Sequence, residues 1–201
     1  MPEDRVKLWD QRHAVATRPA PAEVLLRHAR WLPARGRALD LACGLGANAL
    51  FLAEHGLDAH GWDRSTVALD RLSDEAQRRG LRVAVQQQDV IADPPRPSTW
   101  DVIVCTRFLH RPLCRELVAA LRPGGVLFVQ TFTRLGRVGG GPTNPDFLLE
   151  PAELLALFDG LTVLAAMDGS APAVVQPDSE SVVAGQAWLV GRRASSDDGE
   201  L

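Results

Sequence analysis

The sequence has few cysteines, no long hydrophobic run and no apolar segment at its start. Its three cysteines, Cys43, Cys105 and Cys114, make no CxxC pair and no disulfide framework. The longest apolar stretches, such as residues 102–105, are far shorter than the roughly 20 residues that span a bilayer. The first residues lack the apolar core of a signal peptide. These absences predict a cytoplasmic protein with reduced thiols and no membrane partner.

The chain also has no excess of basic charge. The formal net charge is −3, and Lys7 is the only lysine of the chain. A large nucleic-acid footprint usually needs a basic face, so this balance argues against a nucleic-acid partner. The preference for arginine, with much alanine, leucine, glycine and proline, is typical of a GC-rich genome and says nothing about chemistry.

What is present is ordinary globular material. The chain has 201 residues, of which 46% are apolar and 23% charged. A chain of this size buries about 70% of its unfolded surface and needs no covalent staple. One domain, with at most a small lid, is therefore expected.

Hydrophobic periodicity predicts an alternation of strands and helices after two N-terminal helices at 3–14 and 22–32. The expected strands are 37–41, 57–62, 82–88, 100–105 and 126–132. The expected helices between them are 47–55, 65–79 and 112–121, while prolines at 94, 95 and 97 mark a loop. This alternation is typical of a parallel sheet covered on both faces. The glutamines of residues 82–88 favour an edge strand.

The last third departs from that alternation. A helix at 150–158 is followed by strands at 161–167 and 186–191 with no helix between them, only a long polar loop. These two strands are expected to pair as an antiparallel hairpin at the sheet edge. The predicted fold is α/β, a Rossmann-like doubly wound sheet that is mostly parallel. Residues 1–34 form N-terminal helices that could act as a lid, 35–193 the main domain and 194–201 a disordered tail.

Chemistry-bearing residues gather where the predicted strands end. In an open α/β sheet, ligands bind at the carboxyl ends of the strands beside the point where strand order reverses. Four such ends carry Asp40, Gly44, Gly46, Asp63, Asp89 and Arg107. Each feature alone has a plain alternative: a strand-end aspartate is often a helix cap, and a glycine pair is often only a turn. Their order on successive units favours a ligand site.

The residue types favour S-adenosylmethionine over a dinucleotide. Gly44 and Gly46 let the backbone approach a ligand closely, and Asp63 suits a ribose diol in either cofactor. Asp40 distinguishes the two cofactors. A carboxylate there would repel the pyrophosphate of a dinucleotide but attract the ammonium and the sulfonium of S-adenosylmethionine. Asp89 is expected to accept from an adenine amino group while Val90 supplies a backbone N–H.

The motifs resemble those of class I S-adenosylmethionine-dependent methyltransferases. Residues 37–52, RALDLACGLGANALFL, resemble the first motif of that family, with Ala42 where glycine is usual. WDVIV at 100–104 and ALRPGGVLFVQTF at 120–132 resemble the signatures of the fourth and fifth strands, so the resemblance covers roughly 35–193. GANALFLAEHG and RFLHRPLCRELVAALRPGG are most similar to the bacterial tellurite-resistance branch, whose members act on small molecules.

This resemblance implies methyl transfer from S-adenosylmethionine to a small-molecule acceptor, by in-line displacement that depends on proximity and orientation. It extends the cofactor-binding set to Asn48 and Arg64, and it makes Arg107 and His110 the candidate catalytic residues at the methyl end. A solvated role for both side chains stays open. A glycine run at 139–141 is expected to act as a hinge for residues 134–149.

Other functions stay open as well. The alternatives are an RNA or protein methyltransferase, a pseudoenzyme that binds the cofactor, and a nicotinamide oxidoreductase, which Asp40 disfavours. The five histidines show no ligand spacing, so no metal is expected. The acceptor and the oligomeric state are not readable from the sequence.

Overall fold

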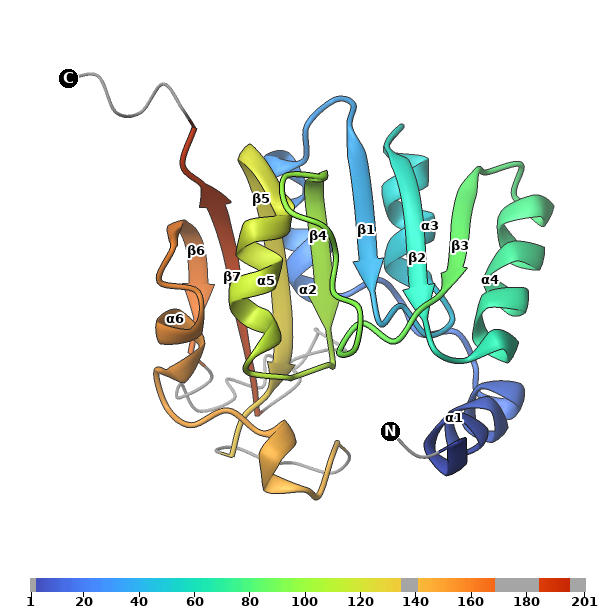
Figure 1. The fold of residues 1–201 in the computed structure, drawn as a ribbon. Helices are drawn as coiled ribbons and strands as arrows, with labels where there is room; N and C mark the ends of the chain where they lie inside the picture. The colour runs from blue at the N-terminus through green and yellow to red at the C-terminus, as the bar shows by residue number, and fades with distance from the viewer. Residues whose placement is uncertain (1–2, 135–140, 169–184, 196–201) are drawn as a thin grey trace, which may run out of the picture.

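The computed structural model describes residues 3–134, 141–168 and 185–195. Within these ranges the strands form a seven-stranded sheet in the order β3-β2-β1-β4-β5-β7-β6. Strands β1 to β5 pair in parallel, and β7 runs antiparallel to both β5 and β6. Figure 1 shows β7 pointing opposite to its neighbours. The predicted doubly wound sheet with an antiparallel edge hairpin is confirmed.

The elements follow the expected alternation closely. The strands are β1 (Arg37–Leu41), β2 (Asp58–Asp63), β3 (Val83–Gln87), β4 (Trp100–Thr106), β5 (Leu121–Phe132), β6 (Leu161–Met167) and β7 (Gln186–Arg193). The helices are α1 (Glu3–Val15), α2 (Glu23–His28), η1 (Ala29–Trp31), α3 (Ala47–Glu54), α4 (Thr66–Arg78), α5 (Leu113–Ala120), η2 (Pro145–Phe147) and α6 (Glu153–Leu157). Strand β3 lies at the edge of the sheet, as its glutamines predicted.

Three predicted boundaries were wrong. Strand β5 begins at Leu121, five residues early, because the chain pairs with Trp100 before an irregularity at the Pro123–Gly125 turn. The second N-terminal helix tightens into the 3-10 turn η1 after His28. The predicted helix 150–158 is only Glu153–Leu157, because a tight turn of the chain occupies the residues before it.

Alternate residues of the central strands point to opposite faces of the sheet and pack into two separate cores. Leu39 and Leu41 pack with α5 and α6, whereas Ala38, which precedes them, packs with α2 and α3. The same alternation puts Ile103 on the first face and Val102 on the second. A third cluster joins α3 and α4 on the second face. Both faces of the central sheet are therefore buried, as a parallel sheet requires.

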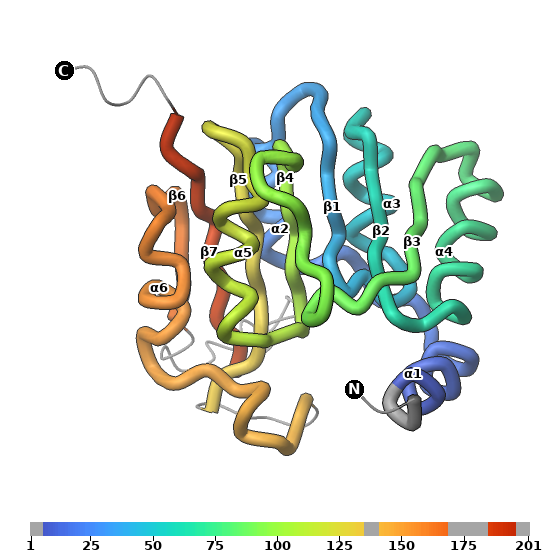
Figure 2. The backbone as a smooth tube through the Cα atoms, in the orientation of Figure 1, coloured from blue at the N-terminus to red at the C-terminus, as the bar shows by residue number. Residues whose placement is uncertain are grey.

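The carboxyl ends of β1 to β4 meet at one edge of the molecule, shown at the bottom of Figures 1 and 2. Helix α1 lies across this edge next to the ends of β2 and α4 (Figure 2). No helix in the described ranges combines the length and hydropathy needed to cross a membrane. The predicted tail, most of the polar loop before β7 and most of the glycine run lie outside the described residues.

Candidate functional site

The turn after β1 is held in a conformation that favours glycine. Ala42, Gly44 and Gly46 all have left-handed backbones, with φ of 54°, 51° and 74°. A Cβ on Gly46 would lie 2.3 Å from the buried Leu72 side chain, so no larger residue fits there without rearrangement. At Gly44 the nearest atom to such a Cβ is His13 Nε2, at 3.4 Å. Gly46 thus serves packing, whereas Gly44 lies where a ligand can approach the backbone.

Asp63 joins the end of β2 to this turn. Its Oδ2 accepts from the Gly44 N–H at 2.7 Å, and its Oδ1 accepts from the Ser65 N–H at 2.9 Å. The carboxylate is only half-buried. An ionised carboxylate has about four lone-pair positions, so two hydrogen bonds leave capacity for two more. The carboxylate is therefore held in a fixed orientation, and its contact with a ribose stays a prediction.

Asp40 is completely buried beneath α3. Its Oδ2 accepts from the Ala49 N–H at 3.1 Å and its Oδ1 from Asn48 Nδ2 at 3.3 Å. Burial raises the pKa of Asp40 to about 8, although these hydrogen bonds act in the opposite direction. The carboxyl is thus largely protonated at neutral pH, and the charge argument against a pyrophosphate loses its force. The helix-cap role that the sequence left open is observed.

Asn48 connects three segments beneath the turn. Its Oδ1 accepts from the Ala22 N–H at 2.8 Å, and its Nδ2 donates to Asp40 and to Thr106 Oγ1 at 3.1 Å. The side chain is 7% exposed, and both its amide oxygen and its amide nitrogen have protein partners. The contacts observed assign it a positioning role; its predicted cofactor contact stays a prediction.

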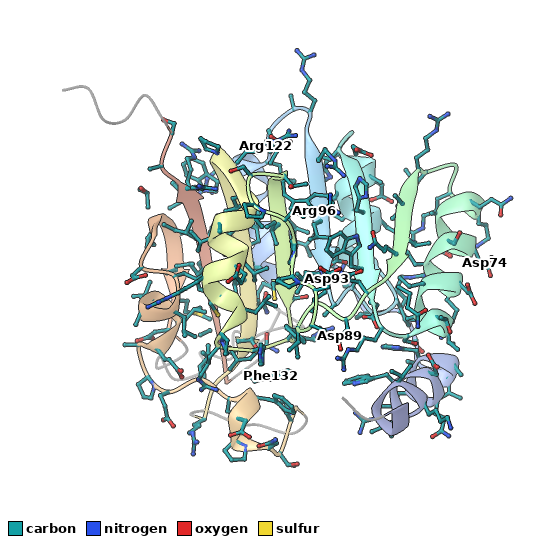
Figure 3. All side chains as sticks on the ribbon, viewed as in Figure 1. Asp74, Asp89, Asp93, Arg96, Arg122 and Phe132 are labelled. Carbon is teal, nitrogen blue, oxygen red and sulfur yellow. The ribbon has the colours of Figure 1, made fainter. Side chains whose placement is uncertain are left out.

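Asp89 and Arg64 form an ion pair beyond β3. Burial acts to raise the pKa of Asp89, but the Arg64 guanidinium and the backbone N–H groups of Ile91 and Ala92 outweigh it and hold the pKa below its usual value. Val90 is buried in the core that packs against α5 and α6. Figure 3 shows Asp89 on the loop that crosses in front of the sheet at its lower edge. The adenine contacts of Asp89 and Val90 stay predictions.

The N-terminal segment is anchored directly on the glycine turn, by contacts that sequence reasoning missed. Arg18 donates to the Leu45 carbonyl at 2.8 Å, and Ser65 Oγ donates to Asp10 Oδ1 at 2.6 Å. Arg71 of α4 binds the carbonyls of His13 and Ala16. No sequence pattern marks these arginines, because their partners are backbone carbonyls distant in the chain.

His13 is the N-terminal side chain that reaches the predicted cofactor residues. Burial lowers the pKa of its imidazole, against the opposing charges of Asp63 and Asp10. Its Nδ1 is buried with no described hydrogen-bond partner. Of its neighbours on α1, Trp9 is 44% exposed and the Arg12 guanidinium stacks on it, 5.1 Å from the ring centre.

Arg107 and His110 follow β4 at the same edge of the sheet. Arg107 has a left-handed backbone, φ 55°, and its N–H donates to the Gln130 carbonyl at 2.8 Å. Its side chain is exposed, while that of His110 is half-buried before α5. The structure brings both to the edge that carries the glycine turn, and their acceptor role stays a prediction. No cluster of three potential metal ligands occurs among the described residues.

Comparison with known proteins agrees with this architecture. Residues 38–125, from β1 to the start of β5, match the family described as the methyltransferase domain. This segment of the chain is similar to a methyltransferase domain over less than half of the chain's length. The matched segment contains the glycine turn, Asp63 at the end of β2 and the whole of β4.

Curated relatives of the domain are ubiquinone biosynthesis O-methyltransferases. The Coxiella burnetii protein is 32% identical over 101 residues, which is 48% of this chain and 43% of the relative. The Methylococcus capsulatus protein is 35% identical over 105 residues, 49% of this chain and 44% of the relative. The match therefore spans less than half the length of these relatives.

Solved structures share the fold over nearly the whole chain. TehB from Haemophilus influenzae has a TM-score of 0.72 at 19% identity, covering 92% of this chain and 66% of TehB. The [4+2]-cyclase SpnF has a TM-score of 0.66 at 22% identity, covering 95% of this chain and 81% of SpnF. The fold of these proteins thus extends beyond the matched segment, and one of them is named for other chemistry.

Proposed function

We propose that the chain is an S-adenosylmethionine-dependent methyltransferase that acts on a small molecule in the cytoplasm. The observation that carries the proposal is the Asp63 carboxylate, fixed by the Gly44 N–H and open to a ribose diol. The methyltransferase-domain match and its O-methyltransferase relatives support the reaction class. The modest net charge supports a small-molecule acceptor over a nucleic acid.

The donor set around the turn fits S-adenosylmethionine. Asp63 and His13 lie at Gly44, and Asp40 is buried beneath the turn. Arg18 also reaches the turn, but its guanidinium is already bound by the Leu45 and Arg71 carbonyls and by Glu75, so it is not free to receive a phosphate. An ammonium held near Asp40 would favour the ionised form of that carboxyl and so gain an attraction that a pyrophosphate would not.

The chain's own residues have separable tasks. When bound, the cofactor supplies a methyl group already activated on its sulfonium, so orientation and water exclusion are the main requirements. Asp63 and the Gly44 backbone would orient it, with Arg64, Asp89 and Val90 around the adenine. Arg107 and His110 would face the acceptor, and His110 would take a proton where the acceptor carries one.

Ligand-dependent stability tests the proposal. S-adenosylmethionine and S-adenosylhomocysteine at 100 times their dissociation constants should each add about 2.7 kcal/mol to the free energy of unfolding, with no effect of NAD or NADP. Calorimetric titration gives the dissociation constants. Stabilisation by NAD alone would contradict the cofactor assignment.

Labelled-methyl transfer across acceptor pools then separates an enzyme from a binding protein. Incorporation into small molecules supports the proposal, whereas incorporation only into RNA or protein would replace its acceptor class. Tight S-adenosylhomocysteine binding without any transfer would favour a pseudoenzyme, an outcome that the shared fold of SpnF makes worth testing.

A further inference from the structure

About three quarters of the arginines with described side chains are engaged. Most form ion pairs, stack on tryptophans or bind carbonyls. Five have no such side-chain contact in the described part of the chain: Arg35, Arg82, Arg96, Arg107 and Arg115. Arg35, Arg82 and Arg96 precede β1, β3 and β4, at the opposite end of the sheet, where Figure 3 labels Arg96. Arg115 is exposed on α5. Arg107 is therefore the one unpaired guanidinium described at the carboxyl edge.

The carboxylates that follow β5 at this edge do not pair with Arg107. Glu153 is bound by Arg111 through both of its oxygens, at 2.5 and 3.0 Å. Glu150 pairs with Arg134 at 2.6 Å. These pairs use other arginines to hold the segment after β5 in place. They leave the positive charge at the end of β4 uncompensated among the described residues.

The backbone of Arg107 is also strained. A left-handed conformation is unfavourable for a residue with a Cβ, and it persists only where the surroundings impose it. Here the Arg107 N–H is fixed on the Gln130 carbonyl of β5, which sets the direction in which the chain leaves β4. No side-chain contact within the described ranges compensates for this strain. Strain of this kind, on an unpaired charged residue at a ligand edge, points to function.

We infer that Arg107 recognises an anionic group, a carboxylate or a phenolate, on the methyl acceptor. This inference rests on the proposed function and names its substrate class. The planar guanidinium binds a carboxylate through two parallel hydrogen bonds, which fixes orientation as well as position. The cofactor also carries a carboxylate, but the proposed function places its amino-acid end at the β1 turn, near Asp40. Arg107 follows β4, beside the half-buried His110.

The experiment uses the full chain saturated with S-adenosylhomocysteine and a matched pair of probes, benzoate and benzamide. The variants are Arg107→Ala, Arg107→Lys and, as control, Arg115→Ala, which removes an exposed and equally unpaired arginine from α5. Binding is measured by thermal shift and by the Nε–Hε signals of isotope-labelled arginine. The unaltered chain should bind benzoate at least tenfold more tightly than benzamide.

The variants then test whether Arg107 causes the preference for benzoate over benzamide. Arg107→Ala should abolish it, Arg107→Lys should retain part of it, and Arg115→Ala should retain all of it. Equal binding of the two probes, including no binding of either, would overturn the inference, as would a preference that survives in Arg107→Ala. The affinity of Arg107→Ala for S-adenosylhomocysteine should stay within threefold, and a tenfold loss would assign the guanidinium to the cofactor carboxylate instead. Failure of S-adenosylhomocysteine to bind the unaltered chain would refute the proposed function itself, a separate result.

Discussion

The two halves of the sheet's carboxyl edge differ in how their polar side chains are bound. Around β1 and β2, Asp40, Asn48 and Asp63 each make two or more hydrogen bonds within the protein. After β4, the Arg107 and His110 side chains make none with the described residues. The first half is preorganised for one ligand, whereas the second depends on its ligand for partners. A cofactor that is always the same suits a preorganised site, whereas an acceptor specific to the enzyme suits side chains that find their partners on the ligand.

The largest expected effect breaks the preorganised half. Gly46→Ala should lower the free energy of unfolding by about 2–5 kcal/mol, combining left-handed strain of ~1–2 with overpacking against Leu72 of ~1–3. Gly80→Ala is the matched control, because Gly80 is also left-handed but has open space at its Cβ position. It should cost only roughly 1 kcal/mol. Equal losses in urea denaturation would show that Leu72 yields easily.

The next effect is a pH dependence located at Asp40. Its pKa is about 8 when folded and about 3.9 when unfolded, so the folded state binds the extra proton between those values. Stability is therefore full near pH 4 and falls as the pH rises toward 8. We expect a loss on the order of 3–4 kcal/mol between pH 5 and pH 8.

Asp40→Asn should remove that slope and be the more stable protein at pH 8. Urea denaturation at several pH values measures it, with Asp70→Asn on the exposed face of α4 as the control. An unchanged slope in Asp40→Asn would assign the pH dependence to another group.

Asp63 tests whether the preorganised half binds the ligand that its geometry suggests. Asp63→Ala should weaken S-adenosylhomocysteine binding more than tenfold, because charge-assisted hydrogen bonds contribute about 1.5–3 kcal/mol each. Isothermal titration checks this, with Asp70→Ala as the control. Because Asp63 also accepts two backbone N–H groups, the same substitution should lower the free energy of unfolding by about 1–3 kcal/mol. Unchanged affinity would separate Asp63 from the cofactor.

The smallest effect compares the two halves directly. Ala42 and Arg107 share a left-handed backbone, and replacing either with glycine should raise stability by roughly 0.5–1 kcal/mol, since relieved strain of ~1–2 exceeds the entropy cost of glycine. Only Arg107→Gly should also lower methyl transfer. If Ala42→Gly lowered transfer equally, the turn geometry rather than the guanidinium would be responsible.

Most of the fold was readable because it depends on local patterns. The strand ends at Leu41, Asp63 and Thr106 lie within a residue of their predicted places, since apolar runs and glycine turns are short-range signals. The start of β5 was not readable, because pairing with Trp100 extends the strand through a Pro-Gly-Gly turn. The anchoring of α1 by Arg18 and Arg71 was equally hidden, because both bind distant carbonyls.

The sequence by itself determined the α/β alternation, the glycine turn and the acidic residue at the end of β2, because each is written in neighbouring residues. Only the tertiary structure decided the charge of Asp40, since a carboxylate next to a strand end is ionised or neutral according to its burial. It also decided that His13 lies against Gly44 and that Arg107, unlike Arg111 and Arg134, has no carboxylate among the described residues. Partners that are not neighbours in the chain are chosen by packing, which no local pattern records.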